Sequence, residues 1–132
     1  MKVVVDTSVW SLALRRGTVA DPHVGLFREL IADGRVALLG AVRQEILSGL
    51  RHPEQFERLK THLRAFPDLE LGTDDYELAA EWFNLCRGRG VQGANTDFLI
   101  CAAATRRGYA ILTADKDFMS FKRFLPIALL TP

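Results

Sequence analysis

The chain has 132 residues and a formal net charge of +1, and 48% of its residues are hydrophobic and 25% charged. This length and composition are typical of one compact domain whose core needs no disulfide bond or structural metal. The near-neutral total implies no long-range attraction to nucleic acid, so any affinity for a polyanion must come from locally clustered charges.

The cysteine and histidine residues exclude the common kinds of zinc site. Cys86 and Cys101 form no CxxC motif and are typical of small core residues in a reducing compartment. The histidines, His23, His52 and His62, lack the spacing of zinc ligands. A hydrolase built on this chain must therefore use oxygen ligands or a nucleophile. Because no apolar run is long enough for a signal peptide or a membrane span, we expect a cytoplasmic protein without membrane association.

The predicted elements alternate between strands and helices. Short β-branched or apolar runs predict strands, and apolar residues at helical spacing predict helices. In chain order these are a strand at residues 2–6, helices at 7–15 and 22–32, a strand at 35–39, helices at 41–50 and 53–66, a short strand at 67–71, helices at 73–87 and 95–107, and strands at 109–113 and 127–130. This alternation predicts a single domain, residues 1–132, of the α/β class with a mainly parallel central sheet.

Polar residues at the starts of three helices predict N-terminal caps, and one of them is Asp21, which precedes a proline at the first helical position. We expect Asp6 or Thr7 to cap the first helix, and Thr73 or Asp74 to cap the helix that starts at residue 73. Such side chains accept hydrogen bonds from backbone N–H groups that lack a partner within the helix.

Two carboxylates follow the ends of predicted strands. Asp6 closes the first strand, and Asp115 lies two residues past Thr113, which ends a later strand. In open parallel sheets, ligands bind beyond the carboxyl ends of the strands, so both acids fall where a site is expected. Asp117 lies two positions further along the chain and is an alternative to Asp115.

Two further carboxylates lie on predicted helices. Asp97 occupies the first turn of a helix whose following residues, 98–104, are all apolar, which is typical of a buried helix. An ionised carboxylate is costly there unless it is paired or bound to a cation, and a helix N-terminus contributes only ~0.3–1 kcal/mol. Glu45 lies at the margin of the apolar stripe formed by Val42 and Ile46, where a side chain reaches a cleft while its helix stays packed.

Each of these residues also has a purely structural interpretation. Asp6 is a candidate helix cap, Glu45 a solvated helix position, and Asp115 and Asp117 candidate turn formers. Asp97 is equally a partner of its helix N-terminus. The functional interpretation depends on all of them lying together.

Carboxylates without histidine or thiolate partners favour hard cations such as Mg²⁺ or Mn²⁺. Such ions, held by acids and water, are the usual apparatus for cleaving phosphodiester bonds. The acids Asp6, Glu45, Asp97 and Asp115 therefore predict a metal-dependent phosphodiester hydrolase.

Basic residues are spread along the chain. They either line an approach for RNA phosphates or form an ordinary solvated surface. The positions concerned are Arg15, Arg16, Arg87, Arg89, Arg106, Arg107, Lys116, Lys122 and Arg123.

Four segments carry a family resemblance. They are VVVDTSVW at residues 3–10, QEILSGL at 44–50, TDFLICAA at 96–103 and LTADKDF at 112–118. In this order and spacing, they make the sequence resemble the PIN-domain family, and within it the VapC toxins of bacterial and archaeal toxin–antitoxin pairs. The resemblance implies a Mg²⁺- or Mn²⁺-dependent endoribonuclease on a three-layer α/β/α fold. It also implies a homodimer and a VapB-type antitoxin partner whose tail blocks the acidic site.

The resemblance also implies roles for individual residues. Asp6 and Asp97 would be the principal metal ligands, and Asp115 would complete the site. Glu45 would bind metal or position water, and Thr113 would support the cluster by hydrogen bonding. Asp117 competes with its neighbour for the last place, and Asp115 is favoured because it lies nearer the strand end.

Other functions remain as alternatives. A housekeeping PIN nuclease for RNA maturation or decay would need no antitoxin. A phosphoacceptor signalling module would need paired acids after the first strand, whereas Asp6 is followed by Thr7 and Ser8. A non-catalytic binding module is a further alternative. No base-reading motif selects tRNA, rRNA or mRNA as the substrate.

Overall fold

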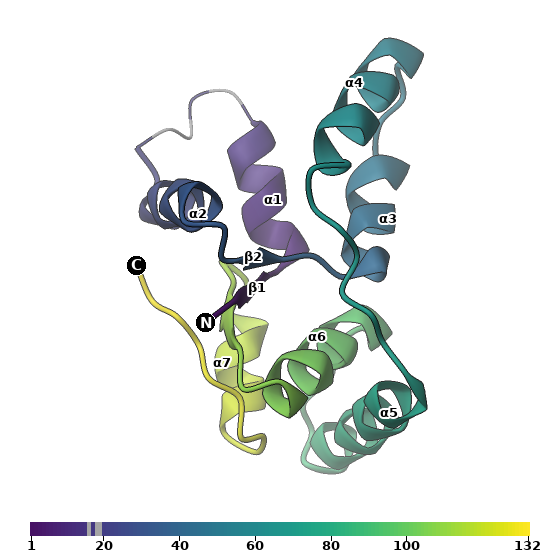
Figure 1. Ribbon diagram of the computed structural model, residues 1–132. Helices are drawn as coiled ribbons and strands as arrows, with labels where there is room; N and C mark the ends of the chain where they lie inside the picture. Colours follow the sequence, from purple (N-terminus) through teal and green to yellow (C-terminus); the bar gives the residue numbers. More distant parts are fainter. Residues whose placement is uncertain (16, 18–19) are drawn as a thin grey trace.

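The chain alternates short strands with seven helices in the part of the chain that the structure describes. The structure is a computed structural model describing residues 1–15, 17 and 20–132. The elements are β1 (Val3–Val5), α1 (Thr7–Leu14), α2 (Pro22–Ala32), β2 (Val36–Ala37), α3 (Gly40–Ser48), α4 (Pro53–Leu63), α5 (Thr73–Gly88), α6 (Asn95–Arg106), β3 (Ala110–Leu112) and α7 (Asp117–Lys122) (Figure 1).

A parallel sheet with the strand order β2-β1-β3 forms the centre of the molecule. The first strand lies in the middle, and its β-branched residues are fully buried, as the sequence predicts for such a strand. Single parallel bridges, Leu38 to Asp68 and Ile111 to Leu129, extend the pairing beyond β2 and β3. The short strands predicted at these two places are therefore reduced to one bridge each.

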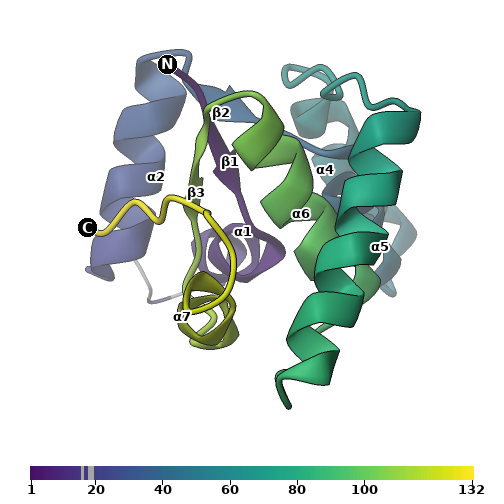
Figure 2. The ribbon, with the colours of Figure 1, turned by 90° about the horizontal axis from the view of Figure 1, so that it is seen from below.

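Helices cover both faces of this sheet. In Figure 1, α1 to α4 lie on one side of the strands and α5 to α7 on the other, and Figure 2 shows α6 packed across β1 and β3. The predicted three-layer α/β/α arrangement with a parallel sheet is confirmed. None of the helices in the described part of the chain is both long enough and apolar enough to cross a bilayer.

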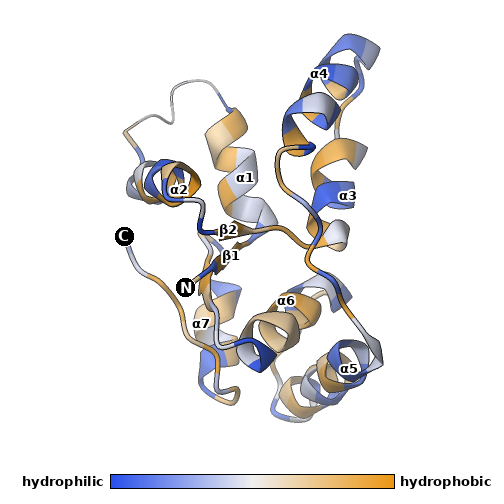
Figure 3. Cartoon of the chain, viewed as in Figure 1, coloured by the Kyte–Doolittle hydropathy of each residue, from blue (hydrophilic) through white to orange (hydrophobic). Residues whose placement is uncertain are grey.

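The core lies between the sheet and the two helical layers. The strands and much of α6 are coloured as hydrophobic in Figure 3, whereas α4 has many hydrophilic residues. Residues 100–104 of α6 are fully buried, so this helix is the buried one that its apolar sequence predicts. Both cysteines, Cys86 and Cys101, are free and buried in this core.

Two helices differ from their predicted extent. The helix predicted at 53–66 ends at Leu63, because the Arg43 guanidinium binds the carbonyls of Leu63 and Phe66, which stabilises a turn there. The sequence analysis predicts no element at α7, whose six residues are too few to show helical periodicity. Its buried side chains, Phe118 and Phe121, hold it against the core.

Of the predicted caps, Asp21 is confirmed at α2, where its side chain accepts a hydrogen bond from the His23 N–H. Asp6 occupies the N-cap position of α1, but its side chain makes no capping hydrogen bond there. At α5 the N-cap residue is Gly72, and its backbone N–H donates to the Asp75 carboxylate at 2.9 Å. Asp75 is 1% exposed and is also bound by Arg106 and Arg107. The Asp6 carboxylate therefore does not cap α1, and neither Thr73 nor Asp74 is the N-cap residue of α5.

Candidate active site

The candidate site begins where β1 and β3 end side by side. The backbone N–H of Asp6 donates to the Leu112 carbonyl at 2.9 Å, which continues the parallel pairing past the last residue of each strand. The residues that follow the two strands, Asp6 and Thr113, therefore emerge as neighbours at the carboxyl edge of the sheet, where the sequence predicts a site.

The Asp6 carboxylate is held by two hydroxyl groups. Its residue is 4% exposed, and its Oδ2 atom accepts hydrogen bonds from Ser8 Oγ and Thr113 Oγ1, both at 2.8 Å. Among the described residues, its other oxygen, Oδ1, accepts no hydrogen bond. A buried carboxylate with one oxygen fixed and the other unpaired is poised to bind a cation.

A chain of hydrogen bonds connects Asp6 to the start of α7. Ser8 Oγ accepts from the Ala114 N–H at 3.0 Å, and Thr113 Oγ1 accepts from the Asp115 N–H at 3.0 Å. Asp115 Oδ1 in turn accepts from the Asp117 N–H at 2.9 Å. The exposed Asp117 thus contributes its backbone to holding Asp115, and the segment after β3 is fixed beside the first helix.

Glu45 is an exposed residue of α3 that is bound from α1. Thr7 Oγ1 donates a hydrogen bond of 2.8 Å to Glu45 Oε1. This contact joins α1 to α3 through two residues that are 38 positions apart in the sequence. It leaves the second carboxylate oxygen of Glu45 outside that hydrogen bond.

Asp97 lies in the first turn of α6, where its Oδ2 accepts a hydrogen bond of 2.9 Å from the Ala94 N–H. Burial raises the pKa of Asp97 to about 6; the Ala94 hydrogen bond opposes this, and the carboxylates of Asp6, Asp115 and Glu45 add to it. Asp6, Asp115 and Glu45 are thus near enough to Asp97 to interact with it electrostatically, and the four predicted acids form one neighbourhood.

Sequence reasoning missed two members of this neighbourhood. From the sequence, Thr7 is predicted only as a candidate helix cap, and Ser8 is noted only as a residue that follows Asp6. Neither is assigned a role in the site. The signal is that two consecutive hydroxyl residues follow a strand-ending acid. Ser8 binds Asp6, two positions away. Two other partners, Glu45 for Thr7 and the Ala114 N–H for Ser8, lie 38 and 106 positions away, and only the tertiary structure reveals them.

The donor set fits a hard divalent cation. Within the described residues, no group of three or more acidic, histidine or cysteine side chains is arranged to hold a metal ion as it stands. Within the same residues, no lysine or arginine forms a salt bridge with any of the four acids. The neighbourhood therefore holds uncompensated carboxylates without thiolate or imidazole ligands, and Mg²⁺ and Mn²⁺ prefer such oxygen donors.

The fold agrees with the comparisons with known proteins. The family model of the PIN domain matches residues 3–123, and the chain belongs to that family. PIN domains are generally nucleases. A search of curated protein sequences finds no match to this chain.

Several solved structures share the fold over nearly their whole length. FitAcB from Neisseria gonorrhoeae aligns with a TM-score of 0.76 and 19% identity, covering 98% of this chain and 97% of that one. VapBC2 from Rickettsia felis, bound to a DNA fragment from its promoter, aligns with a TM-score of 0.76 and 20% identity, covering 99% and 98%. VapBC-5 from Mycobacterium tuberculosis, of the VapBC family of toxin-antitoxin systems, aligns with a TM-score of 0.70 and 17% identity, covering 99% and 98%.

Proposed function

We propose that this chain is a Mg²⁺- or Mn²⁺-dependent endoribonuclease and the toxin of a VapBC-type toxin–antitoxin pair. The observation that carries the nuclease proposal is that Asp6, Glu45 and Asp115, from three other segments, add to the rise that burial causes in the pKa of Asp97. A bound divalent cation would compensate this concentration of negative charge, and membership of the PIN family supports the same chemistry.

The hydrogen bonds support distinct roles for the four acids. Asp6, Asp97 and Asp115 would hold the metal, with the unpaired Oδ1 of Asp6 as one donor. When bound, the metal supplies a Lewis acid that activates water and stabilises the charge developing on the phosphate. Glu45, oriented by Thr7, would hold the attacking water and accept its proton. Thr113 and Asp117 support the site by fixing Asp6 and Asp115.

The toxin role is supported by the likeness to FitAcB, VapBC2 and VapBC-5 over almost the entire chain. We infer from it a homodimer and a cognate VapB-type antitoxin, whose bound segment would block the acidic site. Such a toxin would act on RNA in the cytoplasm.

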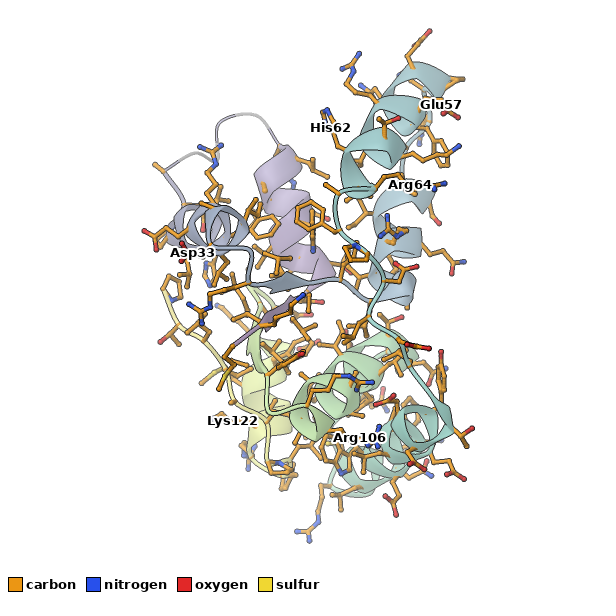
Figure 4. The ribbon with its side chains drawn as sticks, in the orientation of Figure 1. Asp33, Glu57, His62, Arg64, Arg106 and Lys122 are labelled. Atoms are coloured by element: carbon orange, nitrogen blue, oxygen red, sulfur yellow. The ribbon has the colours of Figure 1, made fainter. Side chains whose placement is uncertain are left out.

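The nuclease proposal is tested by cleavage of a panel of tRNA, rRNA and mRNA with Mg²⁺ or Mn²⁺. Asp97→Asn removes one charge from the site, and Asp33→Asn removes one from the exposed end of α2, away from α6 in Figure 4. We expect Asp97→Asn and EDTA each to lower cleavage by at least about 100-fold, since a metal contributes several kcal/mol to the transition state. Asp33→Asn should match the wild type. Equal cleavage by Asp97→Asn and wild type would mean that the activity does not belong to this site.

Expression in a bacterial host separates the toxin from a housekeeping nuclease. Induction of the wild type should arrest growth, and induction of Asp97→Asn should not. Co-expression of the antitoxin should restore growth. Harmless overexpression of an enzyme that cleaves RNA in vitro would contradict the toxin role and favour RNA maturation or decay.

A further inference from the structure

The structure separates the basic residues that are bound within the protein from those that are not. Arg106 and Arg107 pair with the buried Asp75, and Lys122 Nζ donates to the Ile127 carbonyl at 3.3 Å (Arg106 and Lys122 are labelled in Figure 4). Arg16 lies outside the described residues. Within the described part of the chain, the exposed side chains of Arg87, Arg89, Lys116 and Arg123 form neither a salt bridge nor a side-chain hydrogen bond.

Two of these side chains share one aromatic partner. The guanidinium carbons of Arg89 and Arg123 lie 5.6 and 5.2 Å from the centre of the Phe124 ring. The two distances place the guanidinium groups within about 11 Å of each other. A cation–π contact at an exposed site contributes about 0.5–1 kcal/mol, enough to restrain a long side chain without neutralising its charge. We call Arg89 and Arg123, which share the ring of Phe124, the arginine pair.

The loop between α5 and α6 is pressed against α7, and this brings the arginine pair together. A Cβ atom at Gly93 would lie 2.5 Å from Phe121 Cζ and 3.0 Å from Phe98 Cε2. Only glycine permits this approach, so the backbone of the loop rests directly on the aromatic side chains of α6 and α7. Beside this contact lies a cavity of about 230 Å³, whose lining includes Arg87 and Gln92.

The segments that carry the arginine pair also carry two acids of the candidate site. The loop with Arg89 leads into α6, whose first turn holds Asp97. The helix α7, which Arg123 follows, begins at Asp117, two residues after Asp115. The arginine pair is therefore joined to two of the acids by short segments of the chain.

We propose that the arginine pair, with Arg87 at the neighbouring cavity, forms the phosphate-binding surface that holds single-stranded RNA beside the acidic site. This inference rests on the proposed nuclease function. Four carboxylates repel a polyanion, and a net charge of +1 offers no general attraction, so the substrate needs local cations that no carboxylate neutralises. Both guanidinium groups meet that need, and their planar donors suit phosphate oxygens.

The test measures binding of a fluorescently labelled single-stranded RNA oligonucleotide by anisotropy, across a NaCl titration at fixed Mg²⁺. A Glu45→Gln background prevents cleavage during the measurement. The double variant Arg89→Gln/Arg123→Gln is compared with Arg58→Gln/Arg64→Gln, which removes the same charge from exposed positions on and beside α4. A third variant, Arg89→Lys/Arg123→Lys, keeps the charge and controls for a change in packing around Phe124.

The loss of two phosphate contacts should weaken RNA binding by at least about fivefold and reduce the slope of log K against log salt by about 1.4. The α4 variant should change affinity by less than about twofold with an unaltered slope, and the lysine variant should keep most of the slope. The inference is wrong if the arginine-pair and α4 variants behave alike, as they would if this surface served an acidic protein partner instead.

Cleavage separates failure of this inference from failure of the proposed function. With Glu45 intact, Arg89→Gln/Arg123→Gln should raise KM more than it lowers kcat. If this variant cleaves with unchanged KM, the arginine pair plays no part while the nuclease proposal stands. If the unsubstituted chain neither binds nor cleaves any RNA, both fail.

Discussion

Replacing Asp97 by asparagine should make the metal-free protein more stable at neutral pH. The pKa of the Asp97 carboxyl rises from its ordinary value of 3.8 to about 6 on folding, first through burial and then through repulsion from neighbouring acids. At about 1.4 kcal/mol per pKa unit, this corresponds to a cost of up to ~3 kcal/mol for the ionised form. Because the side chain is only partly buried, solvent screening reduces the expected gain to about 1–2 kcal/mol. Asparagine still offers an oxygen to the Ala94 N–H.

The sign of the effect depends on pH. A carboxyl whose pKa is raised by folding binds its proton more tightly in the folded state than in the unfolded state. Its ionisation therefore costs nothing below about pH 3.8, and the cost grows until the pH exceeds about 6. Asp97→Asn should raise the free energy of unfolding at pH 7.5 and have little effect at pH 4.

Differential scanning calorimetry in EDTA checks this expectation at the two pH values. A gain of 1–2 kcal/mol corresponds to an increase in Tm of about 3–8 °C for a domain of this size. Asp33→Asn, at an exposed helix end, serves as the control and should leave Tm unchanged. Adding Mg²⁺ at 100 times its Kd should stabilise the wild type by about 2.7 kcal/mol and Asp97→Asn much less. A variant no more stable than the wild type at pH 7.5, or equally stabilised at pH 4, would refute the reasoning.

Three further substitutions test individual contacts. Thr7→Val removes the hydroxyl that holds Glu45, so kcat for RNA cleavage should fall about tenfold at similar KM. Thr7→Ser keeps a hydroxyl and should restore kcat. An unchanged kcat in Thr7→Val would contradict the positioning role of Thr7. Asp75→Asn removes the buried negative charge that Arg106 and Arg107 bind, and it should lower the free energy of unfolding in urea at pH 7 by about 2–3 kcal/mol. Because those arginines hold the pKa of Asp75 well below its usual range, the wild type should lose this stabilisation only as the pH falls below about 4. Gly93→Ala should lower the free energy of unfolding by about 1–3 kcal/mol, because it forces a methyl group onto an aromatic ring. Gly25→Ala, in open space on a helix, should raise the free energy of unfolding. Equal effects of the two substitutions in urea unfolding would contradict the close packing of the loop.

The sequence predicts the fold well where signals are local. The run of valines at β1, the apolar α6 and the proline at the start of α2 each carry a pattern that neighbouring residues reinforce. The pattern fails for α7, because six residues span fewer than two helical turns. The sequence also predicts two short strands, at residues 67–71 and 127–130, that the structure reduces to single bridges. The extent of such pairing depends on the backbone of the facing strand as well as on the segment itself.

The candidate site is predictable in its residue types but not in its contacts. Asp6 is the clearest example, since its position before a helix predicts a cap, whereas its carboxylate binds Ser8 and Thr113 instead. The choice between Asp115 and Asp117 rests in the sequence on nearness to a strand end, and in the structure Asp115 is the one whose charge raises the pKa of Asp97. That Thr7 orients Glu45 depends on the packing of α1 against α3, which no local pattern encodes.

The acids and the arginine pair together imply that metal and RNA bind cooperatively. Without a cation, the carboxylates repel the phosphate nearest the cleavage point, so the arginine pair alone must hold the strand. A divalent cation offsets part of this negative charge and adds a contact, so RNA affinity of the Glu45→Gln protein should rise with Mg²⁺ at constant ionic strength by about 5–150-fold, the usual range of coupling between two sites. Asp97→Asn in the same background should lose most of this dependence, because one metal ligand is gone. Arg89→Gln/Arg123→Gln should keep the ratio while weakening both affinities. If RNA binds equally well with Mg²⁺ and with EDTA, the strand does not reach the carboxylates, and the arginine pair would then hold it away from the site.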